Sequence, residues 1–212
     1  MKTRLLMKKT RFLSLSLLLL AGCSSLRYKD PSEVEVVAID FGSTDLQQMA
    51  AGMINSFASS PNVAYIDNPK GDDKRVIVYV GDVENRTTEH IDTAGITDKI
   101  QTKLLETGKF RFVAGHHGQE EIDEQVRFQQ SGKVREDMMR SFGKQLGADL
   151  ILYGTLRSID KKKSASLESG GVTTKDKYYQ FVMKAVNIDT AEILWQDEVE
   201  IRKRERKGPF GR

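Results

Sequence analysis

Arg75-Val76-Ile77-Val78-Tyr79-Val80 contains five consecutive apolar residues after its leading arginine. Such a run fits a strand that is buried on both faces, and these strands usually lie at the centre of an α/β sheet. A second run of the same character, Asp149-Leu150-Ile151-Leu152-Tyr153-Gly154, follows later in the chain. The sequence therefore predicts two buried strands, which need helices to cover them.

Helical patterns lie before and between these two runs. Leu46 to Phe57 repeats apolar residues along one helical face, and Thr44 with Gln47 resembles a capping box at its start. A second helix with a C-cap glycine at Gly108 is predicted, followed by two more helical stretches. The markers are Ile96, Ile100, Leu104 and Leu105 for the second helix, Glu120 to Gln130 for the third, and Val134, Met138, Phe142 and Leu146, ending at Gly147, for the fourth.

The remaining segments complete a mixed sheet. Phe110 and Phe112 alternate with basic residues in a short strand, whereas Pro61 to Asp73 is expected to form a loop. The last two strands are expected to form a short hairpin around a turn at Asn187 to Ala191, with a charged face in water. This order predicts the α/β class: a single domain with a mixed central β-sheet, packed helices and a C-terminal β-hairpin.

The N-terminus has the layout of a lipoprotein signal. A basic start precedes the apolar segment Phe12 to Leu20 and small residues before Cys23, the only cysteine of the chain. Leu20-Ala21-Gly22-Cys23 resembles a bacterial lipobox, in which the thiol takes a diacylglycerol and the signal is cut before the cysteine. The apolar segment is shorter than the roughly 20 residues that a spanning helix needs. We predict a signal peptide over 1–22, lipidation at Cys23, a short tether over 23–42 and a globular periplasmic domain over 43–212.

Removal of the signal changes the charge of the chain. The full sequence has 33 basic and 30 acidic residues; residues 1–22 hold five basic and no acidic ones, leaving 28 against 30. The basic balance therefore belongs to the precursor and does not indicate nucleic acid as a partner. Ser24 in place of an aspartate favours the outer membrane. With Cys23 acylated, neither disulfide nor thiol chemistry is expected.

Patterns for catalysis and metal binding are weak. The chain has three histidines, His90 and the adjacent pair His116 and His117, and the pair is expected in an exposed turn. Since a zinc site needs three or four ligands, no metal, cofactor or small-molecule substrate is predicted. Gly81-Asp82-Val83-Glu84 places two carboxylates after a buried strand. A periplasmic hydrolase that uses Asp82, Glu84 or His90 therefore remains an alternative to a non-enzymatic role.

Two basic clusters, Lys161 to Lys163 and Arg202 to Lys207, are read most simply as a solvated loop and a solvated tail. The position of the second cluster near the chain end also predicts partial disorder there. Either cluster could contact an acidic partner surface or anionic phospholipid headgroups.

Six short motifs are spread over the mature chain: Gly42-Ser43-Thr44-Asp45-Leu46, Val83-Glu84-Asn85-Arg86-Thr87, Glu89-His90-Ile91-Asp92-Thr93, Gly108-Lys109-Phe110, Gly147-Ala148-Asp149 and Ala191-Glu192-Ile193-Leu194-Trp195. Together they make the chain resemble the LpoB family, outer-membrane lipoproteins that activate bifunctional class A penicillin-binding proteins. The resemblance covers essentially the whole mature domain and keeps the order of elements predicted above.

The resemblance implies a non-catalytic module that docks on a small domain of the synthase and favours its active state. A class A penicillin-binding protein is the expected partner, peptidoglycan is a further candidate, and the outer membrane is contacted through Cys23. The best-known members carry a long proline-rich linker that this chain lacks; its tether of some 20 residues extends at most about 70 Å. Because loops at strand ends commonly carry function, docking is expected at Asn85, Arg86, Thr87, Glu89 and His90.

Some of these residues also have structural interpretations. Asn85 and Thr87 can close a loop through side-chain hydrogen bonds, and Arg86 could brace that loop or reach a partner. Trp195 is expected either in the core or in a partner contact. The competing function is a lipoprotein subunit of a secretion or assembly complex related to the curli-secretion lipoproteins. Those proteins form pores and need long alternating apolar strands, whereas the C-terminal hairpin is expected to be too short and too charged.

Overall fold

The computed structural model describes residues 27–35, 38–66, 72–135 and 147–208. Its contacts divide the chain into two units, residues 1–33 and 34–212. In the first unit the described residues contain a turn, in which the Glu33 amide donates to the Asp30 carbonyl oxygen at 3.0 Å. All the strands and helices and the whole hydrophobic core of the described residues belong to the second unit. A chain that begins at Ser24 therefore contains everything that packs together in the described structure.

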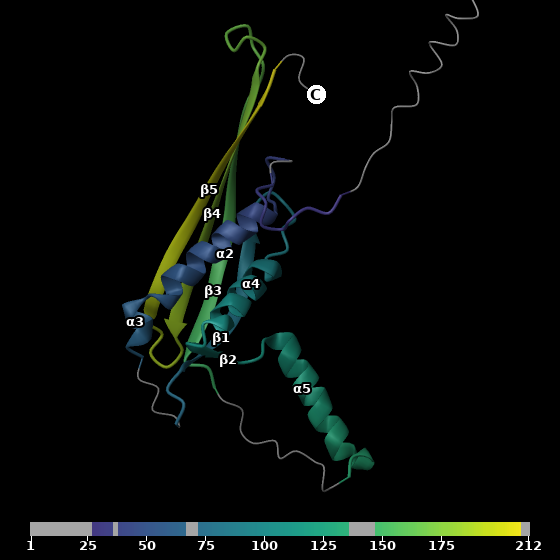
Figure 1. The fold of residues 1–212 in the computed structure, drawn as a ribbon, viewed down its shortest axis with the longest axis vertical. Helices are drawn as coiled ribbons and strands as arrows, with labels where there is room; N and C mark the ends of the chain where they lie inside the picture. Colours follow the sequence, from purple (N-terminus) through teal and green to yellow (C-terminus); the bar gives the residue numbers. More distant parts are fainter. Residues whose placement is uncertain (1–26, 36–37, 67–71, 136–146, 209–212) are drawn as a thin grey trace, which may run out of the picture. The chain divides into compact units, whose positions relative to one another are not determined.

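Within the described ranges, five strands form one mixed sheet in the order β2-β1-β3-β4-β5 (Figure 1). β1 runs parallel to both of its neighbours, whereas β4 is antiparallel to both β3 and β5. The two apolar runs of the sequence lie side by side in it, with Val78 opposite Leu150. The α/β fold with a mixed central sheet is thus confirmed. The strands are β1 (Val76–Arg86), β2 (Phe110–Phe112), β3 (Leu150–Lys163), β4 (Thr173–Asn187) and β5 (Ile193–Lys207).

Two helices, α2 (Ser43–Ala58) and α4 (Ala94–Glu106), supply the apolar stripes that cover the sheet (Figure 1). Met49 and Met53 of α2 and Ile96 of α4 are fully buried in a core shared with β3 and β4, as the helical spacing predicts. Gly108 follows α4 with a φ of 66°, the left-handed conformation expected of a C-cap glycine. The other helical elements are α3 (Pro61–Ala64), α5 (His116–Phe128) and the π-helical turn η2 (Gln129–Lys133).

Several predicted boundaries were wrong for local reasons. α2 is capped by Asp45, whose carboxylate accepts a hydrogen bond from the Gly42 amide at 2.8 Å, and the Thr44 hydroxyl instead accepts one from the Glu35 amide at 2.7 Å. The predicted loop from Pro61 contains α3, because proline suits the first turn of a helix. His116 opens α5 instead of lying in a turn. Met138, Phe142 and Leu146 of the fourth predicted helix lie outside the described residues.

β1 continues through the segment that the sequence suggests is a strand end. Its register against β3 shifts between Val80 and Val83, so β1 contains one extra residue there. Such a β-bulge places Gly81 and Asp82 inside the strand. An added Cβ at Gly81 would lie 3.2 Å from the Leu152 carbonyl oxygen, so the close approach of the two strands favours glycine.

The C-terminal hairpin is longer than expected. β4 and β5 have 15 residues each, and β3 extends through Lys163. Both basic clusters are therefore strand segments, and the readings of them as a loop and a tail were wrong. A physical reason is that oppositely charged side chains lie across the strands: Arg202 and Arg204 bind Asp176 at 2.8 and 2.5 Å. The charged outer face of β5 is confirmed, since Glu198 and Glu200 alternate with half-buried Val199 and Ile201.

Candidate functional site

We call the last two residues of β1 together with its connection to α4, residues 85–93, the β1–α4 loop. The Asn85 side chain closes it: its amide nitrogen donates to the Glu89 and Ile91 carbonyl oxygens at 3.0 and 3.2 Å. Its amide oxygen accepts from the Thr87 backbone at 2.9 Å. The prediction that Asn85 and Thr87 close this loop is confirmed. Thr93 fixes the far end, because its hydroxyl donates to the Val83 carbonyl oxygen at 2.7 Å.

The β1–α4 loop is also joined to the neighbouring strand β3. The Thr88 amide donates to the Ser158 hydroxyl at 3.2 Å, and the Thr88 hydroxyl donates to an Asp160 carboxylate oxygen at 2.6 Å. A loop held by its own asparagine and by β3 keeps one shape. Its exposed side chains therefore form a preorganised surface, which loses little conformational entropy when a partner binds.

Glu89 points into the protein from this loop. Its carboxylate forms an ion pair with Lys177 and accepts hydrogen bonds from the Tyr179 hydroxyl and, at 2.9 Å, from the Phe41 amide. The Glu89 side chain is 19% exposed and that of Lys177 is 9% exposed. Glu89 therefore connects the loop to β4 and to the segment before α2. Its geometry differs from that of the exposed docking contact suggested by the sequence.

Lys177 is the centre of this arrangement. Its ammonium group also forms ion pairs with Asp40 at 2.8 Å and Asp160 at 3.5 Å. We call Asp40, Glu89, Asp160, Lys177 and Tyr179 the Lys177 cluster. Burial alone would lower the pKa of Lys177, but the hydrogen bonds to Asp40 and Glu89 outweigh it and the pKa is raised. The lysine is thus held in its charged form inside the fold.

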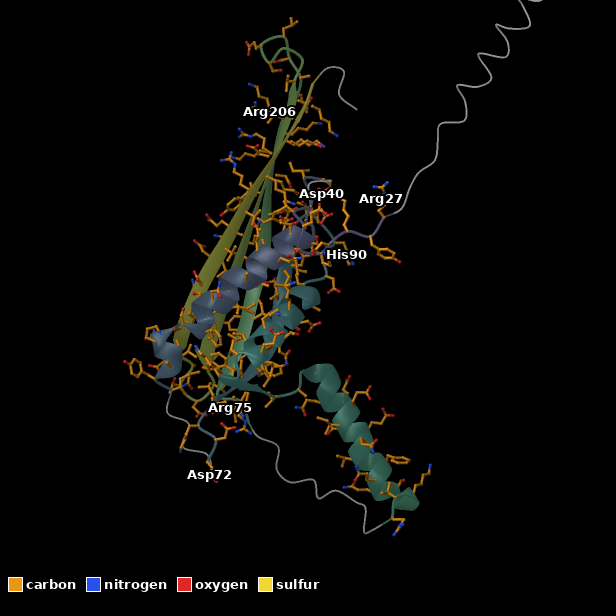
Figure 2. The ribbon with its side chains drawn as sticks, in the orientation of Figure 1. Arg27, Asp40, Asp72, Arg75, His90 and Arg206 are labelled. Atoms are coloured by element: carbon orange, nitrogen blue, oxygen red, sulfur yellow. The ribbon has the colours of Figure 1, made fainter. Side chains whose placement is uncertain are left out.

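A second lysine lies opposite the first in the sheet. Lys203 of β5 is the register partner of Lys177, and like charges in directly opposite positions are unfavourable. Lys203 is neutralised by buried Asp45 of α2 and donates to the Asp40 carbonyl oxygen at 2.7 Å. The two lysines consequently clamp the segment before α2 onto the hairpin. Asp40 and His90 lie at the same end of the helix layer in Figure 2.

The exposed part of the β1–α4 loop is small. Arg86 pairs with Glu84 at 2.8 Å, and both side chains are 55% exposed. His90 is exposed, Asn85 is exposed, and Thr87 is half-buried. Four of the five predicted site residues thus contribute to or border an accessible surface, while Glu89 supports the loop from inside.

The other residues that the sequence suggests as functional, Asp82, Glu84 and Trp195, lie within strands of the sheet. Asp82 and Glu84 are exposed within β1, so they do not form a pair at a strand end. Trp195 is 8% exposed, donates to the Ser56 hydroxyl at 3.0 Å and packs edge-on against Phe57, which places it in the core.

Metal-binding clusters and membrane-spanning helices are both missing from the described residues. In the described ranges no group of histidine, cysteine, aspartate and glutamate side chains has the arrangement of a metal site. Within those same ranges no helix is both long enough and apolar enough to cross a membrane.

Sequence reasoning missed the Lys177 cluster. A signal was present, because Lys177 lies at the same period-two position as four inward-facing residues of β4, namely Tyr179, Phe181, Met183 and Ala185. A lysine in such a row must find acidic partners or reach solvent. Those partners, Asp40, Glu89 and Asp160, come from three separate segments, and no local pattern connects them.

The sequence matches the family model described as peptidoglycan-synthase activator LpoB over residues 45–201. No curated protein matches it. Among solved structures, the LpoB C-terminal domain from Salmonella enterica has 14% identity and a TM-score of 0.43, covering 74% of this chain and 98% of that one. The same domain from Escherichia coli has 17% identity and a TM-score of 0.42, with coverage of 74% and 98%. A lipoprotein from Neisseria meningitidis has 18% identity and a TM-score of 0.36, with coverage of 62% and 84%.

Proposed function

Because this chain belongs to the LpoB family of peptidoglycan-synthase activators, we propose that it binds one class A penicillin-binding protein and raises its activity without catalysing a reaction itself. The observation that carries the proposal is the family match over residues 45–201, which runs from α2 into β5. The family is regulatory and associated with the cell envelope.

The proposal includes attachment to the outer membrane. Residues 1–22 act as the signal peptide, Cys23 carries the lipid, 23–42 form the tether and 43–212 form the periplasmic domain. The lipobox-like sequence Leu20-Ala21-Gly22-Cys23 supports this organisation. Three acyl chains on one cysteine would hold far more firmly than a single chain, since each buried CH₂ contributes about 0.8 kcal/mol.

The docking surface that we propose is the exposed side of the β1–α4 loop. Asn85 fixes the loop, Arg86 and His90 present side chains to solvent, and Thr87 borders them. Glu89 contributes indirectly, because its ion pair with Lys177 holds the β1–α4 loop against β4. A surface that is already ordered suits a regulator, whose effect depends on choosing one conformation of its partner.

Activation requires only a difference in affinity between two states of the synthase. A regulator that binds the active state about 100-fold more tightly than the inactive state can shift the equilibrium by about 2.7 kcal/mol. Equal affinity for the two states would shift nothing. The proposal therefore predicts that the synthase in its active state binds this chain more tightly than the resting enzyme does.

The first test uses the chain from Ser24 to Arg212, without the lipid. We would add it to each purified class A penicillin-binding protein of the same organism and follow glycan polymerisation from the lipid-linked precursor. A several-fold rise with one synthase identifies the client. An unchanged rate together with no binding for every synthase contradicts the proposal.

Paired variants locate the docking surface. We expect His90→Ala and Arg86→Ala to weaken synthase binding, because both side chains lie on the exposed side of the β1–α4 loop. His116→Ala is the matched control, since His116 is an exposed histidine on α5. Equal binding by His90→Ala, Arg86→Ala and His116→Ala would remove the β1–α4 loop as the docking site while leaving activation itself intact.

A further inference from the structure

The open end of the C-terminal hairpin, opposite its turn at Asn187 to Ala191 and beside the connection from β3 to β4, brings together two basic clusters that are about 40 residues apart in sequence. We call residues 161–176 and 204–207 the hairpin tip. Strand β4 forms its middle: Lys162 of β3 lies opposite Lys175 on one side, and Arg206 of β5 lies opposite Thr174 on the other. The hairpin extends past the end of α2, and Arg206 lies on this extension (Figures 1 and 2).

The hairpin tip is strongly basic, with seven basic and three acidic residues in a mature chain that is slightly acidic. Glu205 is shared by Lys175 and Lys207 at 3.6 and 3.3 Å. Lysines 161, 162 and 163 and Arg206 form no ion pair with any other described residue. The register partners Lys162 and Lys175 also place like charges opposite each other, and of the two only Lys175 has an acidic partner, Glu205, among the described residues.

The positive charge surrounds the hairpin tip. Because side chains alternate along a strand, Lys161 and Lys163 belong to the sheet face that carries Arg204 and Arg206. Lys162, Lys175 and Lys207 belong to the opposite face. Away from the hairpin tip, this face packs against α2 and α4. A folded protein partner would cover one face of such a ribbon. The headgroup layer of a bilayer, in contrast, contacts all sides of an element that enters it end-on.

An apolar side chain lies in the loop that closes this tip. Leu167 is completely exposed in the connection between β3 and β4. The turn around it is fixed by hydrogen bonds, including those from the Ser169 and Gly171 amides to the Ser166 carbonyl oxygen at 3.2 and 3.0 Å. An exposed apolar residue beyond a ring of lysines and arginines is the pattern of an interfacial membrane contact.

The same part of the protein receives the chain that leads from the lipid. Val34 and Glu35 line one surface groove together with Arg204 and Glu205 of β5. Ten residues separate Cys23 from Val34, which gives a reach of at most about 40 Å. A lipid on Cys23 would therefore allow the bilayer to reach this groove.

We propose that the hairpin tip docks on the anionic phospholipid bilayer to which Cys23 is attached, with lysines and arginines on headgroup phosphates and Leu167 in the interface. The lipidation of Cys23 decides which bilayer this is. Activation of a synthase in detergent solution requires no such contact, so the two proposals can fail independently. The contact would fix the orientation of the domain at the membrane.

The test measures binding of the mature chain with Cys23→Ser to vesicles, so that the lipid cannot contribute. The protein should co-sediment with vesicles of phosphatidylcholine and phosphatidylglycerol, and it should stay in the supernatant with vesicles of phosphatidylcholine alone. A factor of about five per basic residue predicts a loss of about 100-fold for K161Q/K162Q/K163Q. K74Q/K99Q/K103Q removes the same charge from other positions and should retain binding. Failure to bind anionic vesicles, or equal losses in the two triple variants, overturns the proposal.

A second variant reports on insertion. Leu167→Trp places an indole at the end of the hairpin tip, and its fluorescence should shift to the blue with anionic vesicles, because the ring leaves water. Trp195, which is buried, provides the unchanged background in the parent protein. A vesicle-bound variant in which the emission of the introduced indole stays that of an indole in water would overturn the docking of this loop.

Discussion

Replacing Lys177 by methionine tests whether the Lys177 cluster holds the fold and the β1–α4 loop together. Methionine keeps most of the volume of the side chain and removes its charge. The substitution leaves Glu89 with two hydrogen-bond donors, the Tyr179 hydroxyl and the Phe41 amide, but without its cation. The energetic effect therefore comes mainly from an uncompensated carboxylate in a poorly solvated place.

The expected loss of stability follows from the exposure of the partners. Removing one member of a buried ion pair costs about 3–5 kcal/mol, whereas an exposed pair contributes about 0–1 kcal/mol. Glu89 belongs to the first class, with a side chain 19% exposed; Asp40 and Asp160 are 62% and 42% exposed and belong to the second. Because Glu89 keeps two donors, we expect Lys177→Met to cost about 3 kcal/mol, at the lower end of the range for a buried pair.

The assay is equilibrium unfolding in urea, followed by the fluorescence of Trp195, the only tryptophan of the chain and a buried one. The midpoint should fall while the slope stays unchanged. Combining Lys177→Met with Glu89→Gln should recover more than about 1 kcal/mol relative to the sum of the single changes, since the uncompensated charge is then absent. A loss below about 1 kcal/mol for Lys177→Met, or strict additivity of the two changes, would refute the reasoning.

The pH dependence gives an independent check. Burial raises the pKa of Glu89, but hydrogen bonds from Lys177, Tyr179 and the Phe41 amide together hold it below its ordinary 4.5. Its stabilisation is therefore present above pH 4.5 and is lost as the pH falls through the lowered value. The pKa of Lys177 is raised above its ordinary 10.5, so its contribution is complete below that pH and is lost as the pH rises through the raised value. Without Lys177 the poorly solvated Glu89 carboxylate has a higher pKa in the variant, so the difference between wild type and Lys177→Met should shrink as the pH falls through that higher value. It should also shrink as the pH rises through the raised pKa of Lys177, and it should be constant between these two limits.

Three further changes test other parts of the structure by the same unfolding assay. Gly154→Ala should cost about 2 kcal/mol or more, because its Cβ would lie 2.6 Å from the Val182 carbonyl oxygen; a neutral result would contradict the strand spacing. Gly108→Ala should cost about 1 kcal/mol from its positive φ alone, since no atom lies within 4 Å of the new Cβ, and a larger loss would point to a clash. Asn85→Ala should cost about 1 kcal/mol and loosen the β1–α4 loop, seen as faster amide exchange at Ile91; unchanged exchange would count against the closing role of Asn85.

The core of the fold could be predicted from sequence because its signals are local. The apolar runs beginning at Val76 and Leu150 and the helical spacing from Met49 to Phe57 record burial directly in residue order. The β-bulge at Gly81 could not be predicted, since Gly-Asp reads equally well as a turn. The long hairpin was missed because its distal strands are stabilised by cross-strand charge pairs such as Arg204 with Asp176, which have no apolar alternation.

The local hydrogen bonds of the candidate site could be predicted from the sequence, but its long-range ion pairs could not. The hydrogen bonds of Asn85 span a few residues and follow from a short polar motif. The inward orientation of Glu89 depends on Lys177, which lies 88 positions further along the chain. Whether a charged loop residue faces a partner or the interior is therefore decided by tertiary neighbours, and the sequence alone favours the exposed reading.

The two edge strands of the sheet, β2 and β5, differ in how they discourage pairing with another molecule. β2 is three residues long and offers little backbone to a neighbour, whereas β5 presents 15 residues with no strand beyond it among the described ones. A long open edge strand is a template for edge-to-edge aggregation, and charged side chains on its exposed face make that pairing unfavourable. Glu198, Glu200, Arg202 and Arg206 provide such charges along β5. The proposed lipid attachment would concentrate molecules in two dimensions, so this protection would matter more for a lipid-anchored chain than for a freely diffusing one.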